Sequence, residues 1–460
     1  MMKRSFYIVN NTTFDKVISS LNSTIKEERL SACKAIGQGQ KDSLLSRTVL
    51  QEVNNHVHTM YSFSPYYPSM AAFKAWQAGL TIVGSVDHDS ISASREMKEA
   101  SALIGIASTT GFELRVSFKN SPFKNKKINN PDSKGIVYMV IHGVKLSAIE
   151  EVKEFLLPVQ YARNLRNKKQ VQALNGLINT SGLPLLDFEK DVLPLSLSKE
   201  GGSVTERHIL FALAKKIQDH LKSQEAIVAF LTSTLKIEIP EALKQRLLDT
   251  TNEHFLYDLL GLFKSAYLEK FFIQPNNEEI LDVKFVVDFA LSIGAIPAYA
   301  YLGDISTSVT GDKKSEQFED DYLDELVAYL SSIGFPAITY MPPRNSVEQM
   351  RRLQKLCKQY NLMEISGVDI NSSRQLFNCP ELLKPEAIHL VDSAWALVAH
   401  ELLVEYKSEW GLFHKENPIS TNSLDERIAL YAEFGKKMDP FNPSSIIKKA
   451  KEMLEGATEK

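Results

Sequence analysis

Leu80-Thr81-Ile82-Val83-Gly84-Ser85-Val86 is a continuous apolar run rich in β-branched residues, and it leads directly into Asp87-His88-Asp89. An apolar run without alternation, and this short, is typical of a strand buried on both faces. A second such run, Gly135 to Ile141, leads into His142. The two runs predict buried strands that each end in polar residues.

Helical segments alternate with these strands. Ser90 to Ile104 follows the first strand and is predicted to be a helix capped by a serine. After residue 277 we predict the helices Glu278 to Ile293, Asp321 to Ile333 and Ser346 to Tyr360, and the strands Ala295 to Ala300, Ala337 to Tyr340 and Leu362 to Ser366. Repeated strand-helix units indicate an α/β fold with a parallel sheet, either open or closed.

The chain divides into five segments by composition. We predict a helical N-terminal extension (1–49), a first barrel part (50–146), a helical insertion (147–275), a second barrel part (276–383) and a helical C-terminal segment (384–460). Within the first segment, Thr24 to Ile36 is expected to be a helix that Gly37-Gln38-Gly39-Gln40 ends. A chain of 460 residues fits one large α/β barrel with an insertion.

The net charge and composition limit the classes of molecule that the protein is expected to bind. A formal net charge of −3 gives no overall attraction to nucleic acid or to an acidic membrane. Together with the absence of a basic and aromatic surface signal, this argues against a long nucleic-acid partner. An anionic substrate would be held by local charges or by metal.

The cysteines and the N-terminus favour a cytoplasmic protein that does not enter a membrane. Cys33, Cys357 and Cys379 are odd in number and far apart, so reduced structural thiols are expected. The apolar patch Phe6 to Val9 is too short for a secretory signal. No run approaches the roughly 18 apolar residues of a membrane-spanning helix.

Ligand-type residues follow most of the predicted strands. His56 and His58 are two apart on one strand, so both side chains point to the same side. The other strand-end residues are Asp87, His88, Glu113, His142, Asp304, Arg344, Asp369 and Asn371. The carboxyl ends of parallel strands gather at one face, where these residues would converge.

Imidazole and carboxylate together suit zinc, manganese or iron. A carboxylate such as Glu113 could bridge two ions, and bound metal would make hydroxide available near neutral pH. A lone histidine is more often structural, but His-x-His followed about 30 residues later by Asp-His-Asp is a stronger signal. The remaining histidines, His220, His254, His389, His400 and His414, are expected to be structural or on the surface.

These motifs resemble those of the PHP (polymerase and histidinol phosphatase) family of metal-dependent phosphoesterases. His56-Val57-His58-Thr59, Val86-Asp87-His88-Asp89, Gly111-Phe112-Glu113 with His142-Gly143, and Gly367-Val368-Asp369-Ile370-Asn371 are similar to its four ordered motifs. The resemblance spans roughly residues 50–375. It implies a distorted (β/α)7-type parallel barrel whose metal ligands are His56, His58, Asp87, His88, Glu113, His142, Asp369 and Asn371.

One branch of that family has arginines in a helical insertion. Arg163, Arg166 and Glu206-Arg207-His208 are similar to those residues, which implies that they bind substrate phosphate. For Arg163 and Arg166 the alternative is a solvated basic helix face. Arg344 is added to the predicted substrate-binding residues because it follows a strand.

Three positions depart from the family pattern. Phe63 stands where an aspartate is usual, Tyr301 where a ligand histidine is expected, and Asn371 in place of the last histidine. The resemblance therefore implies one or two divalent transition ions (zinc, manganese or iron) per chain rather than three.

We predict a phosphoesterase that hydrolyses a small phosphate ester by metal-bound hydroxide, with His208 or Asp369 carrying protons. One alternative is a catalytically reduced relative that keeps a metal or phosphate pocket for binding or structure. A second alternative is an exonuclease acting on short oligonucleotides.

Overall fold

The predicted buried strands belong to one sheet. The computed structural model describes residues 11–305 and 317–456. Its eight strands are β1 (Val53–Val57), β2 (Ile82–His88), β3 (Ala107–Ser117), β4 (Ile136–His142), β5 (Leu281–Asp282), β6 (Ile296–Ala300), β7 (Ala337–Tyr340) and β8 (Met363–Ser366). The order in the sheet is β1-β2-β3-β4-β6-β7-β8, and β5 pairs with β3.

The sheet curls into a distorted α/β barrel, as predicted. Beyond β8, Ile370 pairs in parallel with Val57 of β1. The backbone N–H of His58 donates to Ile370 O at 2.9 Å, and the Ile370 N–H donates to His56 O at 3.2 Å. The last and the first parts of the barrel therefore meet at the His56-Val57-His58 segment.

The prediction of a fully parallel sheet is wrong for one strand. β4 runs antiparallel to both β3 and β6, whereas all other strand pairs are parallel. Residues 118–135 join β3 to β4 without a helix. Only a crossover connection returns a chain to a parallel position, so this loop produces an antiparallel pair.

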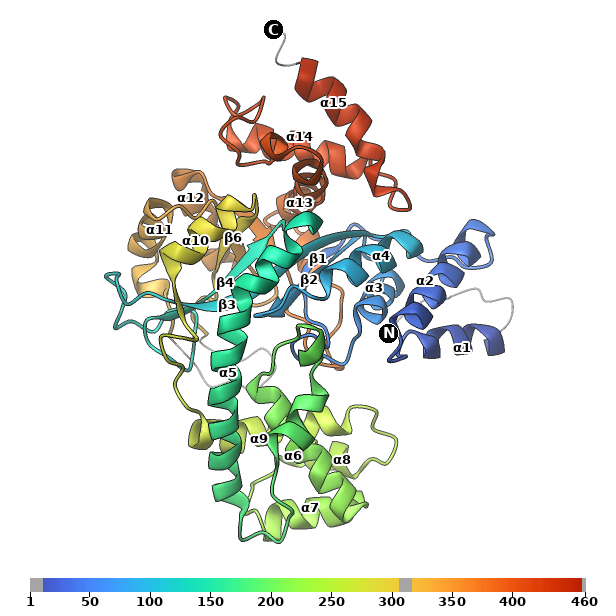
Figure 1. Cartoon of the computed structure of the whole chain (residues 1–460), viewed down its shortest axis with the longest axis vertical. Coiled ribbons are helices and arrows are strands. Elements are labelled where there is room, and N and C mark those ends of the chain that lie inside the picture. The colour runs from blue at the N-terminus through green and yellow to red at the C-terminus, as the bar shows by residue number, and fades with distance from the viewer. Residues whose placement is uncertain (1–10, 306–316, 457–460) are drawn as a thin grey trace.

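Helices cover the sheet (Figure 1). The barrel helices are α3 (Pro68–Gln77), α4 (Ser94–Ile104), α10 (Val283–Ser292), α11 (Leu323–Ser332) and α12 (Val347–Tyr360). The helices α5 (Ile149–Ile178), α6 (Glu206–Leu221), α7 (Gln224–Ser233), α8 (Glu241–Leu248) and α9 (Phe255–Phe271) lie within the predicted insertion. They share a separate hydrophobic core that includes Leu174, Leu213 and Phe263.

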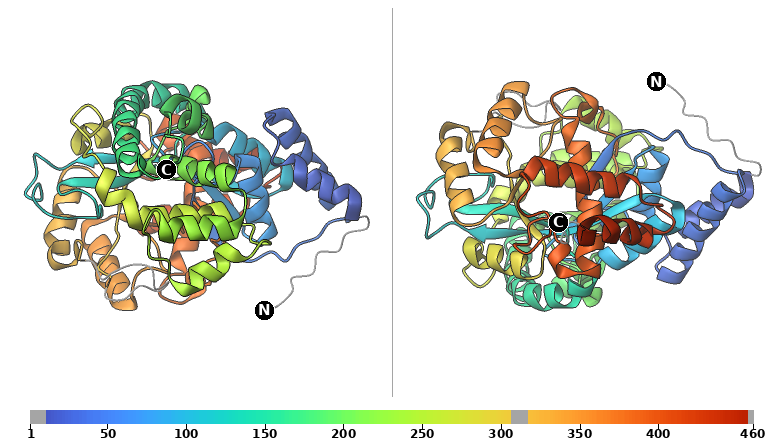
Figure 2. Two further views of the ribbon diagram at one scale, coloured as in Figure 1. Left: turned by 90° about the horizontal axis from the view of Figure 1, so that it is seen from below. Right: turned by 90° about the horizontal axis from the view of Figure 1, so that it is seen from above.

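The remaining helices are α1 (Asn11–Ser20), α2 (Lys26–Lys41), α13 (His389–Tyr406), α14 (Leu424–Lys436) and α15 (Ile446–Gly456). Helices α13 to α15 lie on one side of the sheet and α5 to α9 on the opposite side (Figures 1 and 2). No helix in the described ranges combines the length and the apolar character that a membrane crossing requires.

Three helix boundaries differ from the sequence prediction by four or more residues, and one of them is the start of α10, which lies at Val283 and not at Glu278. Helix α2 continues through Gly37 to Lys41. Gly37 does not end the helix but lets it pack closely against Leu103, since a Cβ at this position would lie 1.9 Å from Leu103 O. Helix α4 begins at Ser94, and the Ser90 hydroxyl donates to Gly201 O at 2.7 Å instead of capping the helix.

Candidate metal centre

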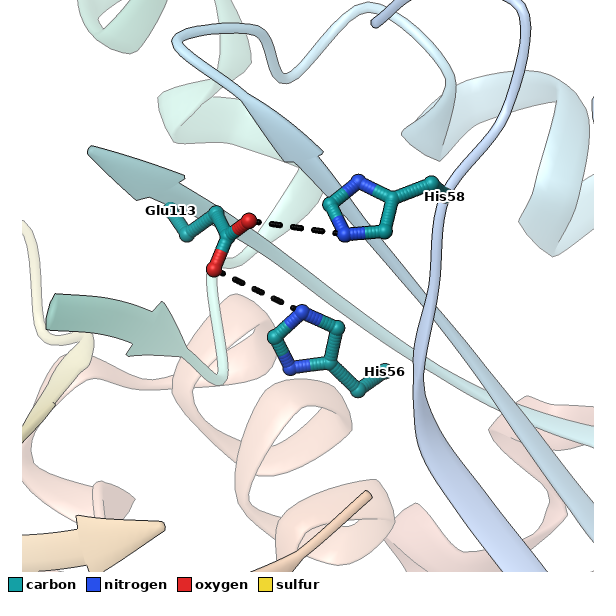
Figure 3. A group of neighbouring side chains, drawn as sticks. All are labelled: His56, His58 and Glu113. Atoms are coloured by element: carbon teal, nitrogen blue, oxygen red, sulfur yellow. Dashed lines mark ion pairs between the residues drawn. The ribbon is translucent and has the colours of Figure 1, made fainter. Parts of the chain in front are cut away.

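His56, His58 and Glu113 form the centre of the candidate site. One possible ligand atom from each lies within 4.8 Å of the others, a grouping that could hold a metal ion. Figure 3 shows that the two oxygens of the Glu113 carboxylate face the two imidazole rings, one oxygen to each ring. The histidines come from β1 and its carboxyl end, and Glu113 comes from β3.

Two more residues complete what we call the histidine–carboxylate cluster: His56, His58, His88, Glu113 and Asp369. The Glu113 carboxylate lies 3.5 Å from His56 Nε2, 3.4 Å from His58 Nε2 and 2.7 Å from His88 Nδ1. Asp369 Oδ1 lies 3.2 Å from His58 Nε2. Three imidazoles and two carboxylates thus converge from β1, β2, β3 and the segment after β8.

Sheet register and one glycine bring these residues together. His88 of β2 lies directly beside Glu113 of β3 in the parallel register. Gly367 passes so close to β1 that a Cβ there would lie 2.4 Å from the Cβ of His56. Because only glycine fits this approach, the chain after β8 reaches β1 and places Asp369 against His58.

Charges within the cluster shift its pKa values. Burial opposes protonation of His58, but the Asp369 and Glu113 carboxylates outweigh it and raise the pKa of His58. Burial opposes ionisation of Glu113, yet His88 and His56 hold the pKa of this carboxyl well below its usual range. The pKa of Asp369 is likewise lowered, against the effect of burial, by His58. Both carboxylates are therefore ionised near neutral pH.

The donor set fits a divalent transition ion. The His58 Nε2 atom is buried and forms no hydrogen bond within the described residues, although it faces two carboxylate oxygens. Imidazole nitrogens and carboxylate oxygens are the ligands that zinc, manganese and iron share. An ion held among these atoms would satisfy the unpaired nitrogen and balance both carboxylates.

Asp87 lies beside the cluster and not inside it. Its carboxylate accepts hydrogen bonds from Thr59 N and Thr59 Oγ1, each at 2.7 Å, and from Ser62 Oγ at 2.6 Å. Ser62 Oγ in turn lies 3.2 Å from His58 Nδ1. Asp87 therefore orients His58 through Ser62. Sequence reasoning did not assign a role to Thr59 or Ser62, although both stand in the short polar loop after the His-x-His strand.

His142 lies close to the cluster although its strand, β4, does not run parallel to β3 as the sequence predicts. It ends the antiparallel strand β4 and pairs with Gly111, two residues before Glu113. Burial, together with His56, lowers the pKa of His142 to about 3, so the ring is neutral. Its Nε2 atom has no hydrogen-bond partner among residues 11–305 and 317–456. A neutral, unpaired imidazole remains available to a metal.

Each of the three residues that depart from the family pattern contacts another side chain of this protein. Asn371 Nδ2 donates to Asp369 Oδ1 at 2.6 Å. Phe63 packs against the rings of His208 and Tyr257, at centroid distances of 5.0 and 5.9 Å. The Tyr301 hydroxyl donates to Asp320 Oδ1 at 2.5 Å, so that hydroxyl is bound to a carboxylate outside the cluster.

Arg163 and Arg166 are only 3% and 6% exposed, so the alternative of a solvated helix face is wrong. Arg163 pairs with Asp89, and Arg166 Nε pairs with Glu279 at 2.6 Å. We call the six charged residues here, of which all but the half-buried Glu206 are buried, the arginine network; its members are Arg115, Arg163, Arg166, Asp89, Glu206 and Glu279. Both guanidinium groups are held by the protein's own carboxylates.

The other predicted substrate-binding residues lie in different surroundings. His208 Nδ1 accepts the Thr205 N–H at 2.9 Å and closes a capping box at the start of α6. Arg344 Nε donates to Leu302 O at 2.9 Å. Arg207 is half-buried and near enough to Asp369 to contribute to lowering the pKa of that carboxyl. The sequence alone could not show that Arg207 lies near Asp369, and the structure places its charge near the cluster.

Comparisons with known proteins show a likeness in structure only. No family model and no curated protein matches the chain. One similar solved structure is described as a "putative metal-dependent phosphoesterase" from Bifidobacterium adolescentis. It is 18% identical, with a TM-score of 0.46, over 74% of this chain and 96% of that chain.

A second similar structure is an amidohydrolase from Chromobacterium violaceum with bound SO4 and no metal. It is 14% identical, with a TM-score of 0.45, over 71% of this chain and 90% of that chain. At these identities and TM-scores, neither activity transfers to this chain.

Proposed function

We propose that this protein is a metal-dependent phosphoesterase of the PHP type that acts on a small phosphate ester. The observation that carries the proposal is the histidine–carboxylate cluster, in which His56, His58 and Glu113 have ligand atoms within 4.8 Å. The residues of this cluster are those of the motifs on which the family resemblance rests.

His56, His58, Glu113 and Asp369 would hold one ion, and Glu113 with His142 would contribute to a second. Bound there, a zinc, manganese or iron ion would activate water near neutral pH and neutralise charge on a phosphate.

Of the three predicted phosphate-binding arginines in the insertion, Arg207 is the one best placed to bind a substrate. Arg163 and Arg166 are paired with Asp89 and Glu279, whereas Arg207 has no carboxylate within ion-pair distance in the described part of the chain. Its position near the start of α6 suits an anion, because N–H groups at a helix start also favour negative charge. We assign Arg207 to substrate phosphate.

Asp369 suits a proton acceptor better than a donor. Its side chain is 39% exposed, and its lowered pKa keeps it ionised. It can therefore accept a hydrogen bond from a water molecule and orient it, although a lowered pKa also makes this carboxylate a weak base. His208 is less suited to proton transfer because its Nδ1 atom closes the helix cap.

A catalytically reduced protein is the second candidate, and one observation favours it. Asn371 stands where the family pattern has its last ligand histidine, and its amide donates to Asp369 Oδ1 at 2.6 Å, so this position offers no imidazole to a metal. Such a protein would keep metal in the cluster but turn over no substrate.

Metal content and turnover together test both candidates. We expect purified protein to carry at least one transition ion per chain and to release phosphate from phosphomonoesters. His58→Ala should lose both properties. His220→Ala, at an exposed histidine on α6, is the matched control and should lose neither.

Protein without metal after supply of zinc, manganese and iron would contradict both candidates. Bound metal would leave only the reduced protein if phosphomonoesters released no phosphate and short oligonucleotides released no mononucleotides. Release of mononucleotides from oligonucleotides, with no phosphate from phosphomonoesters, would identify an exonuclease.

A further inference from the structure

Helix α5 has an exposed apolar stripe. Leu157 is 64% exposed, Tyr161 68% and Leu165 41%. Residues four apart lie on one face of a helix, so the three side chains form a single row. Single exposed apolar residues are common on protein surfaces, but an aligned row on one helix indicates a contact surface.

The opposite face of α5 is fixed to the rest of the protein. Gln160 Nε2 donates to Asp89 O at 2.7 Å, Arg163 pairs with Asp89, and Arg166 pairs with Glu279. These buried contacts prevent the helix from turning its stripe inward. In Figure 1 the helix runs lengthwise along the molecule, and in both views of Figure 2 it lies at the molecule's edge.

Charged residues make the stripe complementary to itself. The exposed Glu154 and Lys168 stand seven residues before and seven residues after Tyr161, and Leu157 and Leu165 stand four before and four after. If a second α5 packs antiparallel with Tyr161 opposite Tyr161, each leucine faces the other leucine. Each Glu154 then faces the Lys168 of the other copy, which is a favourable arrangement of charge at a helix interface.

We propose that two copies of this chain associate through α5, antiparallel, about a two-fold axis at Tyr161. A two-fold contact uses the same patch on both copies, which requires a self-complementary surface. Lys168 also lies 2.6 Å from Glu189 of its own chain, but both side chains are about half exposed. Exposed pairs of this kind contribute little, so Lys168 can exchange partners.

The contact is small. Three apolar side chains from each copy bury less than the roughly 1,200 Å² of a standard stable interface. We therefore expect a weak dimer that dissociates on dilution, with a dissociation constant of about 10 µM.

Sedimentation velocity on the full chain tests the inference, over about 1 to about 200 µM protein. We expect the wild type to move from monomer to dimer across this range. Tyr161→Glu should remain monomeric at every concentration, because it puts two like charges at the axis. Leu177→Glu is the matched control: Leu177 is 41% exposed on the same helix but off the stripe, and its replacement should leave the dimer intact.

A charge exchange tests the antiparallel pairing itself. Glu154→Lys alone should weaken the dimer about tenfold, because it faces Lys168 of the partner. Adding Lys168→Glu should restore the dimer, whereas Glu151→Lys, off the stripe, should not change it. A wild type that is monomeric at the highest concentration overturns the proposal. So does a dimer that Tyr161→Glu leaves intact, or a charge exchange that restores nothing.

Discussion

Two buried groups of charged residues lie next to each other in this protein, and consecutive residues, His88 and Asp89, belong to one each. In the arginine network three guanidinium groups face three carboxylates. In the histidine–carboxylate cluster two ionised carboxylates face three imidazoles. The network is balanced by the chain itself, whereas the cluster is balanced only by adding a cation or protons.

The pKa shifts of two buried histidines illustrate this difference. The pKa of His58 is raised because two carboxylates outweigh its burial. The pKa of His208, beside the network, is lowered to about 3 by burial and by Arg163. At these two buried positions the neighbouring charges, and not burial alone, decide the direction of the pKa shift.

Glu113→Gln should give the largest effect. The substitution removes the carboxylate that contacts His56, His58 and His88 while keeping its shape. Without this charge the cluster should lose its metal, and the rate of phosphate release should fall by roughly 10³-fold, the several kcal/mol that a metal supplies. Metal analysis and phosphate release measure both.

Glu253→Gln, at an exposed position, controls for the change of charge. If Glu113→Gln kept a full complement of metal, the cluster would not be the metal site, and its contrast with the network would disappear.

Arg166→Ala should damage the fold and spare the metal. It leaves the buried Glu279 and the half-buried Glu206 each without one of its partners. Removing one member of a buried ion group destabilises a protein by about 3–5 kcal/mol. Urea unfolding at pH 7 measures the loss, and the folded protein should bind as much metal as the wild type.

Lys168→Ala is the control on the same helix, because the Lys168–Glu189 pair is exposed and should contribute less than about 1 kcal/mol. An Arg166→Ala variant as stable as this control would show that the network does not hold the insertion on the barrel.

Asp87→Asn separates a direct ligand from a residue that orients one. Asp87 accepts three hydrogen bonds from Thr59 and Ser62, and Ser62 contacts His58. Loss of such an orienting residue lowers metal affinity by about 10- to 100-fold. Competition with a metal indicator dye measures the change.

Asp249→Asn, at an exposed aspartate, should leave metal affinity unchanged. A loss at Asp87 as complete as that of Glu113→Gln would mean that Asp87 is itself a ligand, as the sequence motif predicts.

The sequence predicted the sheet and the cluster well where short-range patterns decide them. Apolar runs located β2 and β4 within two residues, and polar strand ends identified His56, His58, His88 and Glu113. The parallel direction of β4 was wrong because strand direction depends on a connection whose path has no local signature.

Long-range contacts explain the other differences. Gly37 is a helix breaker by propensity, but close packing against Leu103 requires a glycine inside α2. Arg163 and Arg166 have Asp89 and Glu279 as partners, and Glu279 is more than 100 residues away from both along the chain. Charge alone could not show that these arginines were already paired.

The smallest effect that we predict concerns pH and His208. Because the pKa of His208 is about 3 in the folded protein and near 6.5 in the unfolded chain, only the unfolded chain takes up this proton between those values. The free energy of unfolding therefore falls as the pH drops below 6.5, and the share of His208 at pH 5 is about 2 kcal/mol.

His208→Gln should remove only the contribution of His208 to the fall in unfolding free energy at low pH. Glutamine is a usual residue at the third position of a capping box, so its side chain can accept the Thr205 N–H and the variant should match the wild type at pH 7. At pH 5 the variant should be more stable by about 2 kcal/mol, since the buried His142 and His400 affect both proteins equally. Urea unfolding at the two pH values gives the difference. An unchanged pH dependence would mean that His208 is protonated in the folded protein, which would return it to the proton-transfer role predicted from the sequence and place it with the cluster instead of the network.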